Sequence, residues 1–187
     1  MGDYVTDTLT SVLNRARART AHHDGYKAAV EIGEAARKQL TVLRGVVGVE
    51  DKAAVERELS LANSLVAAAK GQLEPHLFAL GFTGRVSSFD HEYAASVMRY
   101  AESILSESDR EQLKEIVSSI DAVVFTSTTD VVESHIRHAG SLLRYAADAV
   151  TKAGPYCGLV RLALFAIAVD ALDAADGALY GVYSELG

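Results

Sequence analysis

The chain has 187 residues, of which 49% are hydrophobic, so it can build one domain with a substantial core but falls short of two domains of typical size. Ala, Leu and Val dominate the apolar residues and only two prolines occur, a composition that favours helices over strands. The formal net charge of -7 argues against a protein that coats nucleic acid through overall positive charge. We therefore expect a single all-α domain over residues 1–187.

The first half of the chain shows helical spacing of its apolar residues. Positions three to four apart predict a helix that starts near Val5 and enters a basic segment, and a second helix over residues 26–44. Acidic residues favour the start of a third helix near residue 50, which we expect to reach about residue 71. Pro75 then permits a short helix over residues 75–80.

The second half continues the helical pattern. We expect helices from residue 85 or 88 to residue 105, over residues 109–124, from Asp130 to about Lys152, and over residues 156–185. The last helix is apolar almost all round in its first half, which predicts burial in the core or in a subunit contact. Neither a strand-like alternation nor a repeat of fixed length occurs, so the fold expected is an antiparallel bundle of about six to seven helices.

No membrane or secretory segment is expected. The longest apolar stretch, residues 158–172, is interrupted by Arg161 and Asp170 and is too short to span a bilayer. The first residues, MGDYVTDTL, lack the basic and apolar regions of a secretory leader. The single Cys157 cannot close an intrachain disulfide and is more simply a packed thiol than a nucleophile. These features predict a cytoplasmic protein in a reducing compartment.

Basic residues are concentrated near the N-terminus. Residues 1–44 hold seven Lys and Arg against five Asp and Glu, whereas residues 45–144 hold nine against fifteen. One guanidinium group can bind two phosphate oxygens at once, so this segment could form a phosphate-contacting surface. The alternative is a helix face that is simply exposed to solvent. The residues concerned are Arg15, Arg17, Arg19, Lys27, Arg37, Lys38 and Arg44.

Two further groups of polar residues have simpler structural interpretations. His135 and His138 share a helix face, but metal binding needs a third ligand that the spacing does not identify, so a structural or surface role is favoured. Asp170, Asp173 and Asp176 recur every three residues and could gather a hard cation. Their spacing on an apolar helix more simply predicts its solvent-facing stripe.

Three acidic residues remain as candidates for metal-assisted hydrolysis of a phosphodiester. Such chemistry needs several carboxylates around one or two divalent ions. Glu92 has Ala95 and Ser96 at the positions where a second acid on its face would lie. Asp130 and Glu133 are spaced three apart, and Asp130 is equally well interpreted as a helix cap.

Taken together, three segments resemble the translin and translin-associated factor X (TRAX) family. They are DGYKAAVEIGEAARKQLTVLRGV (residues 24–46), GFTGRVSSFDHEYAAS (residues 81–96) and DVVESHIRHAGSLLRYAADAVTKAGPY (residues 130–156). The second is similar to the family segment around Q-E-Y-V-E-A. The third resembles a helix that starts with an aspartate and carries an arginine fourteen residues later, here Asp130 and Arg144.

The resemblance implies about seven helices, a hollow homo- or hetero-octamer and binding of single-stranded RNA or DNA at its inner surface. TRAX-like members are metal-dependent endoribonucleases that use two glutamates and an aspartate, which would fall on Glu92, Ala95 and Asp130. The second glutamate is therefore missing, and the acidic residue expected three positions before the late arginine is Ser141. Losing one of three carboxylates weakens binding of Mg²⁺.

We accordingly expect a translin-like subunit that binds single-stranded RNA or DNA within an oligomer, either alone or with a translin or TRAX paralogue. One alternative is a Mg²⁺-dependent endoribonuclease with Glu92 and Asp130 as metal ligands and Glu133 as a third acid. Another alternative is a helical assembly protein without nucleic-acid binding. The nucleic-acid contacts expected are Arg15, Arg17, Arg19, Arg37, Lys38 and Arg44.

Overall fold

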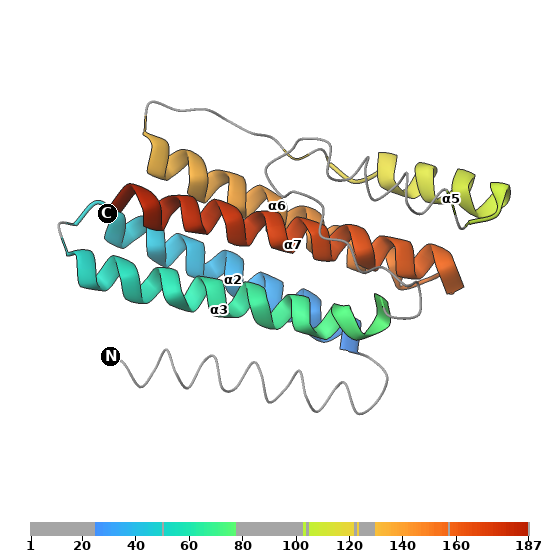
Figure 1. The fold of residues 1–187 in the computed structure, drawn as a ribbon, viewed down its shortest axis with the longest axis horizontal. Helices are drawn as coiled ribbons and strands as arrows, with labels where there is room; N and C mark the ends of the chain where they lie inside the picture. The colour runs from blue at the N-terminus through green and yellow to red at the C-terminus, as the bar shows by residue number, and fades with distance from the viewer. Residues whose placement is uncertain are drawn as a thin grey trace.

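A computed structural model describes residues 25–49, 51–77, 103, 105–121, 123, 130–156 and 158–186. This part of the chain holds five helices and no strand, which confirms the all-α prediction (Figure 1). The helices are α2 (Gly25–Val47), α3 (Lys52–Leu77), α5 (Glu107–Ser118), α6 (Val131–Ala153) and α7 (Gly158–Leu186).

The four long helices form a bundle in which neighbouring helices run antiparallel to one another (Figure 1). Helix α2 packs against α3 and α6, and α7 packs against the same two helices, so α2 and α7 occupy opposite corners of the bundle. Helix α5 lies at one end and contacts α7 (Figure 1). This arrangement leaves the α2/α6 side of the bundle opposite the α3/α7 side.

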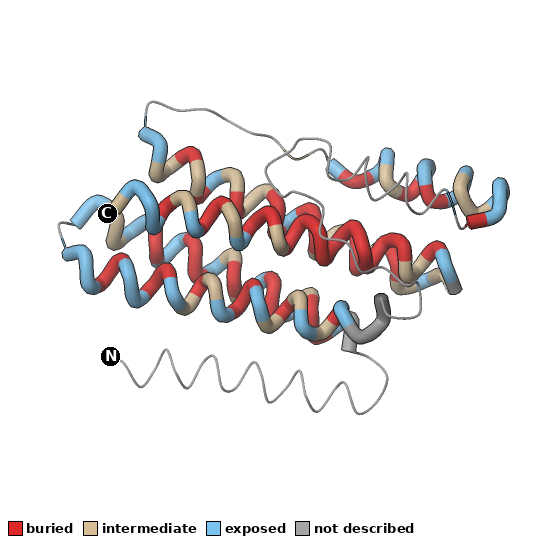
Figure 2. The backbone as a smooth tube through the Cα atoms, viewed as in Figure 1, coloured by how far each residue is buried: buried red, intermediate tan, exposed pale blue. Residues whose placement is uncertain are grey.

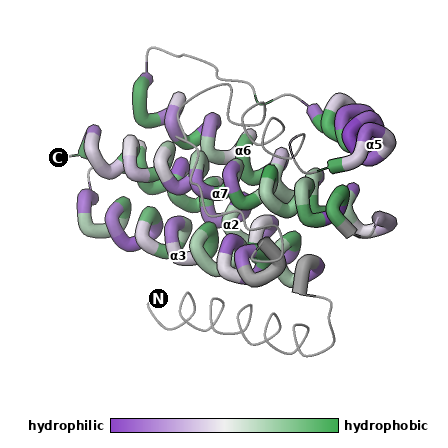
Figure 3. The backbone as a smooth tube through the Cα atoms, turned by 45° about the vertical axis from the view of Figure 1, so that its right-hand side comes forward, coloured by the Kyte–Doolittle hydropathy of each residue, from purple (hydrophilic) through white to green (hydrophobic). Residues whose placement is uncertain are grey.

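Helix α7 supplies much of the core. Its central turns are buried almost continuously (Figure 2), and Leu164, Phe165 and Ile167 are among the largest fully buried side chains. The predicted burial of the first half of this helix is confirmed. Helix α5 is instead largely hydrophilic (Figure 3) and buries Leu113 and Ile116. Within the described residues, none of the helices combines the length and apolarity needed to cross a membrane.

The predicted boundaries of two helices are wrong. Helix α3 continues past Gly71 and through Pro75 to Leu77, because Leu73, between the two, is completely buried in the core and its packing outweighs the local helix-breaking signals. Helix α5 starts earlier and ends earlier than predicted. Ser106 Oγ accepts a hydrogen bond from the backbone N–H of Asp109 at 3.2 Å. Ser106 is therefore the N-cap, and the helix begins at Glu107, two residues before the expected start.

The predicted solvent stripe on α7 is wrong at Asp170. That residue is only 2% exposed, and its Oδ2 atom has no hydrogen-bond partner. Burial raises the pKa of Asp170 to about 7, with a further contribution from the charge of Asp173. Asp173 Oδ1 lies 2.5 Å from Lys70 Nζ on α3 and is half-buried, so Asp176 is the exposed member of the three.

Candidate functional site

A groove of 350 Å³ runs between α2 and α6. Each helix contributes two arginines to it, Arg37 and Arg44 from α2 and Arg137 and Arg144 from α6. Both pairs are seven residues apart, which is close to two helical turns, so each pair faces the same side of its helix. The groove is also lined by Leu40, Thr41, Ile136, Gly140 and Ser141.

Glu133 on α6 holds two of the four arginines. Arg44 Nε lies 3.0 Å from Oε1 and 3.1 Å from Oε2 of Glu133. Arg137 Nε donates to Oε1 of the same carboxylate at 2.9 Å. Both contacts use the Nε edge, and the terminal amino groups of the two arginines make no hydrogen bond to any described residue. Glu133 therefore orients both guanidinium groups while leaving most of their donors available.

The other two arginines are held more loosely. Arg37 Nη1 pairs with Glu34 Oε1 at 3.1 Å, and both side chains are largely solvent-exposed. Arg144 is exposed, and within the described part of the chain it takes part in no recorded salt bridge. The groove thus has an excess of positive charge, although the protein as a whole is acidic.

The floor of the groove is apolar and depends on a glycine. Leu40 and Ile136 are buried beneath the arginines. A Cβ atom placed on Gly140 would lie 3.7 Å from Leu40 Cδ1, which is ordinary van der Waals contact. The absence of a side chain at Gly140 therefore keeps the groove open above Leu40.

The candidate acidic residues that the structure describes have other partners. Asp130 is the N-cap of α6, and its Oδ1 accepts a hydrogen bond from the backbone N–H of Glu133 at 3.2 Å. The Glu133 carboxylate is directed at Arg44 and Arg137. Within the described residues, no three His, Cys, Asp or Glu side chains are grouped so that they could hold a metal ion. Glu92 lies outside those residues, so Mg²⁺-dependent cleavage stays a prediction.

The predicted basic residues fall into three groups. Arg37 and Arg44 line the groove, whereas Lys27 and Lys38 are exposed and are not part of its lining. Sequence reasoning did not propose Arg137 as a contact, and it noted Arg144 only through the family resemblance. The seven-residue spacing repeated on two helices is the signal that could have identified both. The remaining candidates, Arg15, Arg17 and Arg19, lie outside the described residues.

His135 has a packing role. Its ring lies against α7 so closely that a Cβ atom on Gly181 would stand 2.7 Å from His135 Cε1. Such a distance is far below van der Waals contact, so a side chain at residue 181 would require the His135 ring to move. The contact supports the structural role that the sequence favoured for this histidine.

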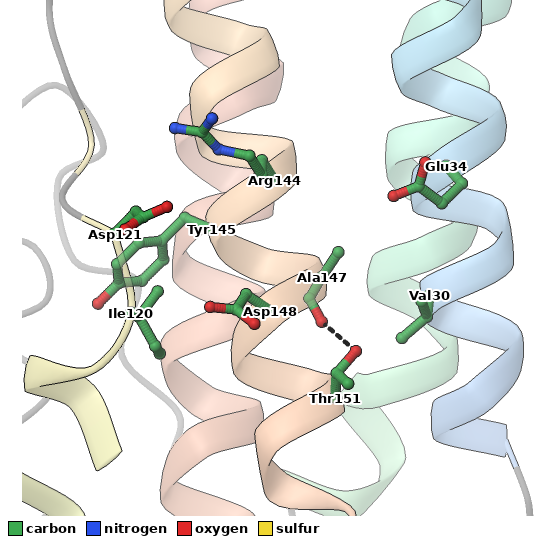
Figure 4. Close-up of a pocket in the computed structure, with 9 residues that line it drawn as sticks. All are labelled: Val30, Glu34, Ile120, Asp121, Arg144, Tyr145, Ala147, Asp148 and Thr151. Carbon is green, nitrogen blue, oxygen red and sulfur yellow. Dashed lines mark hydrogen bonds between the residues drawn. The ribbon is translucent and has the colours of Figure 1, made fainter. Parts of the chain in front are cut away.

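A second pocket of 350 Å³ adjoins the groove, and Arg144 lines both. Figure 4 shows α6 in the centre, with Glu34 of α2 on one side and Asp121 on the other. Tyr145 is 6% exposed, and burial, together with the charge of Asp148, raises the pKa of its phenol. The remaining lining residues are Val30, Ile120, Ala147 and Thr151.

Comparisons of this chain with models of protein families, with curated proteins and with solved structures found no match. The relationship to the translin family therefore stays a prediction from the three sequence segments.

Proposed function

We propose that this chain binds the sugar-phosphate backbone of single-stranded RNA or DNA in the groove between α2 and α6. The observation that carries the proposal is that α2 and α6 each line one groove with a pair of arginines. A phosphate oxygen pair matches the planar donor edge of a guanidinium group, and such contacts are charge-assisted. Four arginines along a groove can therefore follow a phosphodiester chain.

The salt bridges within the groove do not prevent this binding. Exposed ion pairs contribute only about 0–1 kcal/mol, and Glu34 and Glu133 each occupy a small part of the donor set. A phosphate can bind the terminal amino groups of Arg44 and Arg137, which no described residue engages, without displacing Glu133. The net charge of -7 lowers long-range attraction, but the nearby arginines determine the local field.

The proposal includes the wider architecture expected from the family resemblance. In it, the full chain forms six to seven helices and assembles in the cytoplasm into a hollow oligomer, alone or with a translin or TRAX paralogue. The groove and the N-terminal Arg15, Arg17 and Arg19 would face its cavity, where charges of one sign act together. Sizing by light scattering tests this part, since a monomer would contradict it.

Binding to a short abasic single-stranded oligonucleotide tests the groove itself, because this probe offers phosphates without bases. We would measure fluorescence anisotropy across a salt series from about 50 to 200 mM. The test variant is Arg37→Gln with Arg144→Gln, which leaves the Arg44–Glu133–Arg137 contacts intact. The matched control is Arg57→Gln with Lys114→Gln, which removes the same charge from exposed positions on α3 and α5.

The wild type should lose affinity as salt rises. Each lost phosphate contact should reduce the slope of log affinity against log salt by roughly 0.7, so the test variant should have a visibly flatter slope. The control variant should keep the wild-type slope. No binding by the wild type, or equal slopes for the two variants, would show that the groove does not bind phosphate.

A further inference from the structure

The pocket beside the arginine groove has the opposite charge. Three of its lining residues are carboxylates, namely Glu34, Asp121 and Asp148. Arg144 lies where the pocket meets the groove and lines both. A ligand that extends along α6 therefore meets guanidinium donors first and then carboxylate acceptors, with one arginine at the boundary.

Two of these carboxylates are available as acceptors. Asp121 is exposed and forms no recorded salt bridge within the described residues. Asp148 forms an ion pair with Lys152, whose Nζ lies 3.8 Å from Oδ2, a distance too long for a hydrogen bond, so the carboxylate oxygens can still accept one. Glu34 is instead engaged by Arg37. In Figure 4, Asp121 and Asp148 lie on the same side of the pocket as Tyr145, and Glu34 lies across from them on α2.

The carboxylates do not form a cation site in the described structure. They are not grouped so that three of them could hold one metal ion, and no such group occurs elsewhere in the described residues. Separated carboxylates suit a ligand with N–H donors, because an ionised carboxylate accepts hydrogen bonds and donates none. The apolar side chains of Val30, Ile120 and Ala147 also line the pocket and offer surface to a flat ring. Its volume lies within the range of small-molecule sites, about 300–1,000 Å³.

We propose that this acidic pocket receives the base of a nucleotide whose phosphate lies in the arginine groove, and that it selects bases with an exocyclic amine over uracil and thymine. The inference rests on the proposed function, since Arg144 joins the two sites. The amine of cytosine donates to Asp or Glu carboxylates. Uracil has a carbonyl oxygen at the same position, which would face a carboxylate oxygen without any proton between them.

Cytosine and uracil form a closely matched pair of probes, because the two pyrimidines differ only in the group at C4 and in the proton at N3, which uracil carries and cytosine lacks. We would measure affinity for short oligo(dC), oligo(dU) and an abasic strand of the same length. The test variant is Asp121→Asn with Asp148→Asn, in which each amide keeps the shape of the acid but adds a donor. The control is Glu56→Gln with Glu111→Gln, which neutralises two exposed carboxylates on α3 and α5.

The wild type should bind oligo(dC) roughly fivefold or more tightly than oligo(dU). The test variant should bring that ratio close to one while retaining affinity for the abasic strand, and the control should keep the wild-type ratio. Equal wild-type affinity for the two oligonucleotides, with normal abasic binding, would overturn the base pocket but not the phosphate groove. A preference that persists in the test variant would also overturn it. Failure to bind any of the three strands would overturn the proposed function as well.

Discussion

Arg44 of α2 and Glu133 of α6 join the two helices that form the groove, with Arg44 Nε 3.0 Å from Glu133 Oε1. Their contact connects the last turn of α2 to the first turn of α6. Glu133 also holds Arg137 four residues along its own helix. Glu133, which the sequence suggested as a third acid of a metal site, therefore orients two arginines.

A double-mutant cycle on Arg44→Ala and Glu133→Ala should give a small coupling energy. Both side chains are partly exposed, at 49% and 22%, and such pairs contribute about 0.2–1 kcal/mol. Urea unfolding of the two single variants and the double variant would measure the coupling. It should decrease as salt is added. A coupling energy well above this range that is insensitive to salt would mean that the pair is buried in the assembled protein.

Two glycine substitutions should change stability in opposite directions. Gly181→Ala places a methyl group 2.7–2.9 Å from three atoms of the His135 ring, so the ring must leave its place against α7, and this repacking should cost about 1–3 kcal/mol. That cost exceeds the gain in helix propensity of about 1 kcal/mol. Gly33→Ala meets nothing within 4 Å and should stabilise the protein by about 0.5–1 kcal/mol.

Urea unfolding measures both glycine variants. Replacing His135 by alanine in the Gly181→Ala background should recover part of the lost stability, because the colliding ring is removed. Additive effects of the two substitutions would show that the ring is not the source of the cost.

The stability of the protein should depend on the ionisation of Asp170. Folding raises the pKa of this carboxyl from 3.8 to about 7, so between these values the folded chain binds a proton that the unfolded chain has released. The free energy of unfolding must then fall as pH rises through this window and level off above it. Asp170→Asn removes the ionisable group and should be more stable than wild type by roughly 2–4 kcal/mol at about pH 8.

Near the lower end of the window, at about pH 4, wild type and Asp170→Asn should have nearly equal stability. Asp176→Asn on the same helix is the control, because Asp176 is exposed. Comparing urea midpoints across pH measures these differences. A constant difference between Asp170→Asn and wild type at every pH would contradict the assignment.

Substitutions of Asp130 can distinguish its role as a helix cap from a role as a metal ligand. Asparagine caps a helix about as well as aspartate, whereas alanine costs about 1 kcal/mol. We expect Asp130→Asn to retain wild-type stability and Asp130→Ala to lose that amount in thermal or urea unfolding. A Mg²⁺-dependent RNA cleavage that wild type performs and Asp130→Asn lacks, despite intact stability, would assign a metal-binding role to Asp130.

Helix positions with strong local signals could be predicted from the sequence. Asp130 followed by regularly spaced apolar residues predicted a helix to about Lys152, and α6 spans Val131–Ala153. Gly71 and Pro75 led to a wrong end for α3, because the burial of Leu73 is a tertiary effect. Asp170 was misassigned for the same kind of reason, since a three-residue repeat does not reveal which neighbouring helix covers it.

The candidate site could be predicted only in part. Arg37 and Arg44 were identified because they lie in a basic segment, which is a local property. Arg137 and Arg144 lie in an acidic region of the sequence and become relevant only when α6 packs beside α2. Charge counted along the chain therefore missed a basic surface formed by two helices that are distant in sequence.

Gly140 is a position at which the shape of the groove can be changed without changing its charge. Gly140 lines the groove, and a Cβ atom at this position would rest against Leu40 Cδ1 at 3.7 Å. A larger apolar residue there would fill the space and leave all four guanidinium groups in place. An uncharged substitution at Gly140 would therefore change steric access to the groove while its electrostatic potential stays constant.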